Sequence, residues 1–166
     1  MAKKQRKMPV KWSMYARKDN EVAQLLEEDG LSFKFHPTDS DTNAVESYDT
    51  NIMGKFVCRN EECKAKPWSS RQIAITIRMY PGNEYNARVY HQHCKHCKSL
   101  SQPILDASYA ERVAYRLKKW SGIRVQPPPF KGKSGKPHKS DLCEGCKAGH
   151  CIAGNYLTDM FDGLRL

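Results

Sequence analysis

The chain has 166 residues, of which 39% are hydrophobic, and its formal net charge is +10. This length suits one compact domain with extensions or two small units, and the low hydrophobic content excludes a large apolar core. No segment reaches the roughly 18 apolar residues that a membrane helix needs, and the basic start MAKKQRKMPVKW lacks the apolar stretch of a secretory signal, so membrane insertion is not expected.

Seven cysteines are an odd number, which does not suit a framework of disulfides. Without a secretory signal we expect a cytoplasmic or nuclear protein, and thiols stay reduced in both compartments. Closely spaced cysteines in a reducing compartment indicate metal ligands.

The charge is distributed unevenly along the chain. Residues 1–18 carry +7, residues 19–50 carry −8, and residues 51–166 carry +11. Clustered basic charge in a small zinc protein is typical of a phosphate-rich partner. Solubility alone is the alternative explanation.

Taken in chain order, the segments predict four regions. Residues 1–18 are a basic flexible tail. Residues 19–53 contain a short helix, over 21–28, followed by an acidic linker rich in turn residues. The cysteines all fall within 54–154, which we expect to form the zinc-binding domain, and 155–166 is a short C-terminal tail.

Within 54–154, two alternating segments predict a β-hairpin. The strands are expected over 71–79 and 85–93, with a turn at 81–84. Ser108 and Glu111 predict a capped helix whose apolar side packs on the hairpin. The expected fold is a small α+β zinc-binding domain: an antiparallel hairpin sheet of the zinc-ribbon type, one packed helix and a C-terminal zinc knuckle.

The hairpin joins two pairs of cysteines, Cys58 with Cys63 and Cys94 with Cys97. A tight turn supplies two zinc ligands with little loss of entropy, and structural zinc sites usually combine two such turns. These four thiols are therefore predicted to bind one Zn²⁺. A redox role for the Cys94 and Cys97 pair is the less favoured interpretation.

The stretch HKSDLCEGCKAGHC supplies a second set of ligands. Cys143, Cys146 and Cys151 need a fourth donor, and His138 suits better than His150, because adjacent residues rarely reach the same tetrahedral ion. We therefore expect two zinc ions in total. Two alternatives stay open: His138 is an ordinary linker residue, or the two sets of ligands interleave.

Basic and aromatic residues on one hairpin face and on the helix suggest contacts with single-stranded RNA, where aromatic and arginine side chains stack on bases. The alternative for each residue is ordinary surface charge. The candidate contacts are Arg71, Arg78, Arg88, Tyr90, Arg112, Arg116 and Lys119.

These motifs together resemble the 3CxxC-type zinc finger family over about residues 54–152. The matching pieces are GKFVC at 54–58, KPWSS around Trp68, HQHCKHC around Gln92, and His138 with LCEGCKAGHC. The first cysteine pair departs from the family, with four intervening residues instead of two. The membrane anchor of the receptor-transporting members is not expected here.

The resemblance implies structural zinc, and some members of the family bind RNA. We therefore expect a structural zinc protein that binds RNA through a basic surface, with DNA still open as the target. The alternative is a protein-interaction adaptor without nucleic-acid binding. Enzyme activity is not expected, because eight protein donors would fill two closed zinc sites.

Overall fold

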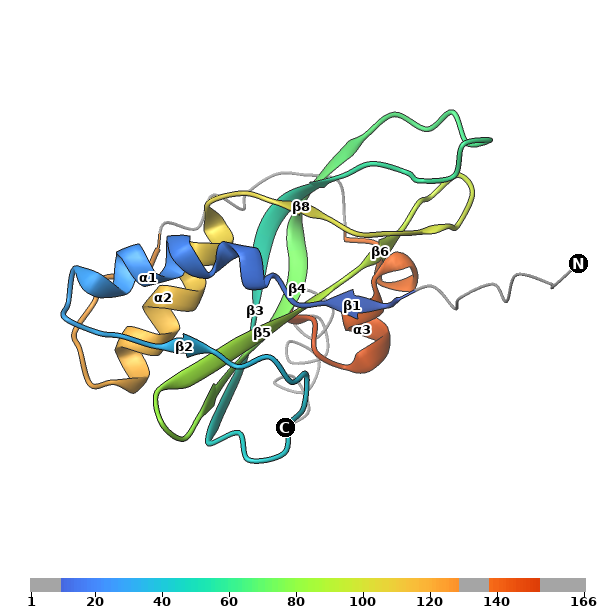
Figure 1. Ribbon diagram of the computed structural model, residues 1–166. Coiled ribbons are helices and arrows are strands. Elements are labelled where there is room, and N and C mark those ends of the chain that lie inside the picture. The colour runs from blue at the N-terminus through green and yellow to red at the C-terminus, as the bar shows by residue number, and fades with distance from the viewer. Residues whose placement is uncertain (1–9, 129–137, 153–166) are drawn as a thin grey trace, which may run out of the picture.

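The computed structural model describes residues 10–128 and 138–152 (Figure 1). The predicted C-terminal tail, 155–166, and residues 1–9 of the predicted basic tail lie outside this part. Residues 10–18, also expected as flexible tail, contain a short strand and a 3-10 turn instead.

The chain forms one main sheet, a small second sheet and three α-helices in the described part. The strands are β1 (Trp12–Ser13), β2 (Lys34–Phe35), β3 (Glu46–Phe56), β4 (Trp68–Tyr80), β5 (Glu84–Tyr90), β6 (Gln92–His93), β7 (Leu100–Ser101) and β8 (Ile104–Leu105). The helices are α1 (Asp19–Glu27), α2 (Ser108–Trp120) and α3 (Glu144–Ala148), with 3-10 turns at Ala16–Lys18 and Ser140–Leu142. Among the described residues, no helix combines the length and apolarity that crossing a bilayer requires.

The main sheet has the order β1-β5-β4-β3-β8, and β2 pairs in parallel with β5. The β4–β5 hairpin confirms the predicted one, and both Gly82 and Asn83 at its turn have positive φ angles. Strands β6 and β7 form the separate second sheet. The small α+β fold with a zinc-ribbon hairpin is therefore confirmed, in a larger sheet than the hairpin alone.

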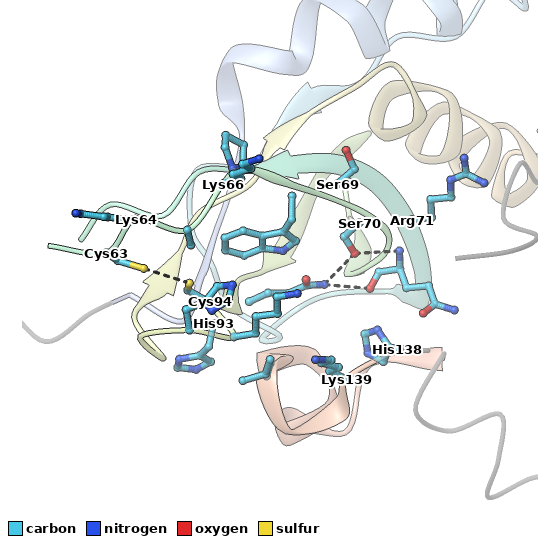
Figure 2. A pocket seen from close by; sticks show the side chains of 18 residues that line it. Cys63, Lys64, Lys66, Ser69, Ser70, Arg71, His93, Cys94, His138 and Lys139 are labelled. Atoms are coloured by element: carbon cyan, nitrogen blue, oxygen red, sulfur yellow. Dashed lines mark hydrogen bonds between the residues drawn. The ribbon is translucent and has the colours of Figure 1, made fainter. Parts of the chain in front are cut away.

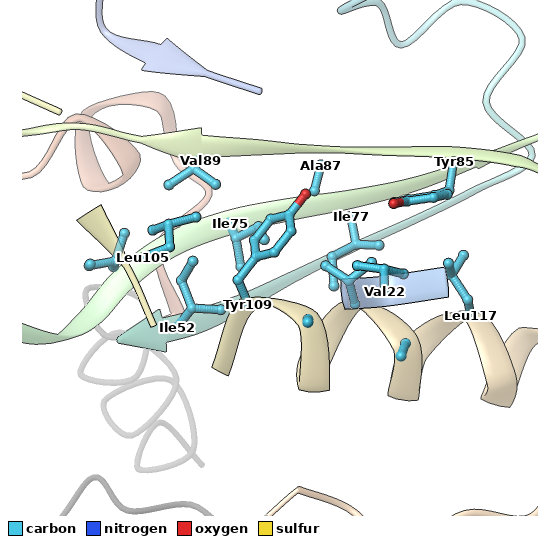
Figure 3. Packing of buried hydrophobic residues seen from close by; sticks show 14 of the residues in the cluster. Val22, Ile52, Ile75, Ile77, Tyr85, Ala87, Val89, Leu105, Tyr109 and Leu117 are labelled. Atoms are coloured by element: carbon cyan, nitrogen blue, oxygen red, sulfur yellow. The ribbon is translucent and has the colours of Figure 1, made fainter. Parts of the chain in front are cut away.

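Helices α1 and α2 cover one face of this sheet (Figure 1). The alternating residues Ile73, Ile75 and Ile77 of β4 are fully buried against them. In Figure 3, Tyr109 and Leu117 of α2 meet the sheet residues from below. Full burial of one such side chain contributes roughly 1.5–3 kcal/mol, so this layer supplies the main hydrophobic core.

The opposite face of the hairpin is also covered, which the alternating pattern did not predict. Arg78 is 0% exposed and Tyr90 is 1% exposed, so the expectation that both lie on an open strand face is wrong. The chain between β2 and β3 covers Arg78, where Asp41 Oδ1 accepts from its guanidinium at 3.0 Å. The segment that carries α3 covers Tyr90, which packs with Cys143 and Cys151.

Two further expectations differ from the structure. The polar segment after residue 37 was expected to be a linker up to 53, but β3 begins at Glu46 and pairs with β4 along most of its length. The predicted capping box is absent, because Ser108 is already inside α2 and its Oγ accepts a hydrogen bond from the backbone N–H of Met53 at 2.8 Å. Tertiary pairing thus replaces the local structures that the sequence suggests.

Candidate metal centres

The first centre gathers four cysteines: Cys58 and Cys63 lie in the β3–β4 connection, and Cys94 and Cys97 follow β6. Their Sγ atoms all lie within 4.8 Å of one another. Two turns position them. In the first turn, the backbone N–H of Cys63 donates to the carbonyl oxygen of Asn60 at 2.9 Å. In the second turn, the backbone N–H of Lys98 donates to the carbonyl oxygen of Cys94 at 2.8 Å. Lys98 has a positive φ angle, which closes the second turn.

The spacing of these thiols fits a tetrahedral zinc ion. The Sγ atoms of Cys58 and Cys97 are 3.4 Å apart, and those of Cys63 and Cys94 are 3.9 Å apart. Zinc–sulfur bonds of about 2.3 Å at tetrahedral angles put two sulfur atoms about 3.8 Å apart. No disulfide joins the cysteines, so all four remain available as ligands. The looser C-x4-C pair therefore still reaches the same site.

Hydrogen bonds and neighbouring thiols shift the pKa values of these cysteines in opposite directions. Hydrogen bonds from the side chain and backbone of Ser99 lower the pKa of Cys97 to about 5. A backbone hydrogen bond from Asn60 lowers the pKa of Cys58, but burial and the adjacent thiols outweigh it and raise that pKa to about 12. Four thiolates at this distance need a cation to offset their repulsion, which is what Zn²⁺ supplies.

The second centre lies on the α3 segment. His138, Cys143, Cys146 and Cys151 offer one nitrogen and three sulfur atoms, all within 4.8 Å of one another. His138 Nε2 is 3.2 Å from Cys146 Sγ and 3.5 Å from Cys151 Sγ, close to the roughly 3.6 Å expected around zinc. The predicted pairing of ligands is confirmed, and two zinc ions fit the two centres.

This second centre is more deeply buried than the first. Cys143 and Cys151 are buried, whereas three of the four ligands in the first centre are partly exposed. Gly145 lies between two of the ligands, and a Cβ atom there would be only 2.3 Å from the Cβ of Ala74 on β4. Close approach of α3 to the sheet therefore requires glycine at this position.

The two centres are connected through β6. Gln92 forms an isolated β-bridge with Cys143, and the backbone N–H of Glu144 donates to His91 O at 3.1 Å. The side chain of Glu144 also pairs with His93, which precedes the first-centre ligand Cys94. Strand β6 thus contacts the α3 segment and leads into the second turn of the first centre, and ligands of both centres line a shared space.

That space is a cavity of about 1120 Å³. Figure 2 shows Cys63 and Cys94 of the first centre on one side and His138 with Lys139 on the other. Five lysine or arginine residues and three histidines are among its 18 described lining residues, and none of these is an aspartate or glutamate. The basic residues are Lys64, Lys66, Arg71, Lys95 and Lys139.

Of the seven predicted nucleic-acid contacts, only Arg71 lines this cavity. Arg88 is 16% exposed in its side chain, pairs with Asp39 at 2.8 Å and lies over the Trp12 ring. The predicted helix residues belong to α2, and none of them lines the cavity. Arg112 donates to the carbonyl oxygen of Asn51, Arg116 lies over the Tyr48 ring, and Lys119 is exposed.

The sequence did carry a signal for the cavity residues that the prediction missed. Five lysines stand immediately after a predicted metal ligand. Three of them line the cavity: Lys64 follows Cys63, Lys95 follows Cys94, and Lys139 follows His138. A turn whose cysteines bind zinc has a fixed backbone. Basic residues next to the ligands are therefore held in place more firmly than basic residues on an exposed helix face. Alternation and helical periodicity do not detect this arrangement.

Comparisons with known proteins agree with the geometry of the two centres. The profile of the 3CxxC-type zinc-ribbon family, described as a zinc-binding domain, matches residues 51–149. Neither a curated protein nor a solved structure matches the chain. The matched region contains seven of the eight donors and spans more than half of the chain. The chain therefore belongs to the 3CxxC-type zinc-binding family.

Proposed function

We propose that the protein binds single-stranded RNA in the cavity between its two zinc centres. The observation that carries this proposal is the composition of the cavity, whose described lining holds five lysine or arginine residues and no acidic residue. Phosphate contacts from such residues supply most of the sequence-independent affinity for nucleic acid. Trp68 also lines the cavity, and aromatic side chains are the usual partners of unpaired bases.

The negative charge of the two metal centres does not cancel the positive charge of the cavity lining. A zinc ion with four thiolates carries about −2, and one with three thiolates and a neutral histidine carries about −1. The five basic residues of the cavity exceed this sum, and four of them are lysines whose side chains are exposed. The cavity therefore keeps a positive balance that favours an anionic strand.

In this proposal zinc is structural and the protein is not an enzyme. Each centre has four protein donors, whereas a catalytic zinc keeps one position for water or substrate. The zinc ions would hold the two walls of the cavity apart and in register. We further propose that the protein works in the cytoplasm or the nucleus, where RNA is present.

The test is fluorescence anisotropy of zinc-loaded protein with a labelled single-stranded RNA across a range of salt concentrations. A cavity variant carries Lys64→Gln, Lys66→Gln and Lys95→Gln. The loss of three phosphate contacts should weaken binding by about tenfold or more near physiological salt, and should reduce the log–log salt slope by about 2.

A matched control carries Lys34→Gln, Lys55→Gln and Lys119→Gln. These lysines are exposed like the first three, and none lines the cavity. Both variants lose the same charge, so equal weakening would mean a diffuse electrostatic effect and would contradict the cavity. No RNA binding by the unaltered protein at low salt would contradict RNA binding altogether and favour the adaptor alternative.

A further inference from the structure

The cavity has an uncharged inner wall behind its basic rim. The rim consists of the exposed side chains of Lys64, Lys66, Arg71, Lys95 and Lys139. The inner wall consists of Trp68, Ser70, Gln72 and Gln92, which are partly or largely buried. A phosphate backbone needs only the rim, and an uncharged wall with an aromatic ring suits a ligand group other than phosphate.

Gln92 presents a fixed polar group in this wall. It is 9% exposed, and its Nε2 donates to Ser70 Oγ at 3.2 Å and to the carbonyl oxygen of Gln72 at 3.3 Å; dashed lines mark both bonds in Figure 2. Those two bonds use both amide hydrogens and fix the orientation of the amide. None of the described residues donates a hydrogen bond to Oε1, so this oxygen is left as an acceptor.

Trp68 supplies an aromatic surface beside this acceptor. Its ring stacks on Phe56 with a centroid distance of 5.1 Å and an interplanar angle of 10°. Phe56 is fully buried, so it supports one face of the indole firmly. A planar ligand can then stack only on the other face of the indole. Because Phe56 already holds the ring in place, Trp68 loses little side-chain entropy when a ligand stacks on it.

We propose that this cavity takes an unpaired base out of the strand, with the base stacked on Trp68 and a hydrogen-bond donor of its edge facing Gln92 Oε1. The rim would hold the flanking phosphates. This inference rests on the proposed RNA binding and specifies what enters the site. Duplex RNA is excluded by the same geometry, because its bases are stacked and their pairing edges are occupied.

The experiment compares two labelled probes of the same length and charge on zinc-loaded protein. One is an eight-residue oligoadenylate, and the other is the same ribose-phosphate backbone without bases. The unaltered protein should bind oligoadenylate roughly tenfold more tightly, because stacking of one base on an aromatic side chain is the added contact. Equal affinity for the two probes would overturn the inference.

Variants identify the residues responsible. Trp68→Ala should abolish the preference for the probe with bases, whereas Trp68→Phe should keep most of it. Gln92→Met should reduce the preference and leave the affinity for the base-free probe unchanged. Zinc content, measured for each variant, shows whether it has folded, and Trp120→Phe is the control outside the cavity.

The failure of this inference differs from that of the proposed function. If RNA binding depends on Lys64, Lys66 and Lys95 but the two probes bind equally, the cavity binds backbone only and the inserted base is wrong. If neither probe binds, the proposed function itself is wrong.

Discussion

At the scale of single residues, Arg78 has the environment least expected for a charged side chain. Its guanidinium is fully buried, donates to Asn86 Oδ1 at 2.9 Å and pairs with Asp39 and Asp41. Burial opposes ionisation of Asp39, but hydrogen bonds from Arg78 and Arg88 outweigh it and lower the pKa of Asp39. A lowered carboxyl pKa means that this stabilisation is complete at neutral pH and is lost only as the pH falls through that lowered value.

Arg78→Met should therefore lower the free energy of unfolding by roughly 1–3 kcal/mol, because it takes the cation from the partly buried Asp39 and a donor from the buried Asn86. Urea unfolding of the zinc-loaded variant at neutral pH measures this. The exposed Arg124 provides the control, and Arg124→Met should change stability by no more than about 0.5 kcal/mol. A similarly small change for Arg78→Met would mean that the contacts of Arg78 with Asp39, Asp41 and Asn86 contribute little to stability.

Gly145 permits a prediction with a built-in rescue. Gly145→Ala should displace α3 from β4 and weaken zinc binding at the second centre, because its new Cβ meets the Cβ of Ala74 at 2.3 Å. Adding Ala74→Gly removes that contact and should restore zinc affinity. Glycine in the middle of β4 should itself lower the stability of the fold by up to about 1 kcal/mol. Competition with a zinc chelator measures both. Failure of the second substitution to rescue the first would mean that the effect of Gly145→Ala has another cause.

At the scale of elements, the two centres stabilise different parts of the chain. The first closes the ends of β3, β4 and β6, whereas the second holds α3 against the far face of the hairpin. In small zinc-binding units, the free energy of metal binding contributes directly to the free energy of folding. The loss of one zinc should therefore loosen only the elements that its ligands carry.

Cys143→Ser with Cys146→Ser should halve the zinc content and expose the segment 138–152, while the β4–β5 hairpin stays folded. Native mass spectrometry counts the zinc, and hydrogen exchange reports on each element. The comparison is Cys58→Ser with Cys97→Ser, which removes the other ion. Loss of both ions from either variant would contradict two separate centres.

The sequence predicted the elements and ligands whose signals are local. The β4–β5 hairpin follows from alternation and a strong turn, the α2 packing face follows from helical spacing, and the ligands follow from cysteine spacing. The part of strand β3 from 46 to 53 was missed because its outer half, ESYDT, is polar and mostly exposed, so it lacks an alternating apolar pattern. Burial of Arg78 depends on acids about 40 positions earlier in the chain, and no local pattern shows that contact.

The cavity could not be predicted for the same physical reason. Its walls come from 63–72, 92–96 and 138–142, segments far apart in the chain that the fold and the two centres bring together. The sequence predicted RNA contacts from basic residues on one face of a helix, because helical periodicity is visible there. Basic residues next to zinc ligands follow neither a strand nor a helix periodicity, although the metal fixes their positions.

At the scale of the whole molecule, the more exposed centre should release its metal first. Three ligands of the first centre are partly exposed, and two of the second are fully covered by the fold. A chelator should therefore remove zinc in two phases, with Cys58, Cys63 and Cys97 the first to react with a thiol reagent. Mass spectrometry of alkylated peptides gives the order, and simultaneous labelling of both sets would contradict it.

Because ligands of both centres line the cavity, RNA binding should fail once the first zinc has left, before the molecule unfolds. Anisotropy and far-ultraviolet circular dichroism, followed together during chelation, separate the two events. RNA that remains bound to metal-free protein would mean that the cavity does not require zinc.

The most direct measurement for the central claim is ultraviolet crosslinking of single-stranded RNA to the zinc-loaded protein, with the crosslinked peptides sequenced by mass spectrometry. The account predicts crosslinks within 64–72 and 92–96, at the wall between the two zinc centres. Crosslinks confined to Arg112, Arg116 and Lys119 on α2, or none above the background of the cavity variant, would contradict it.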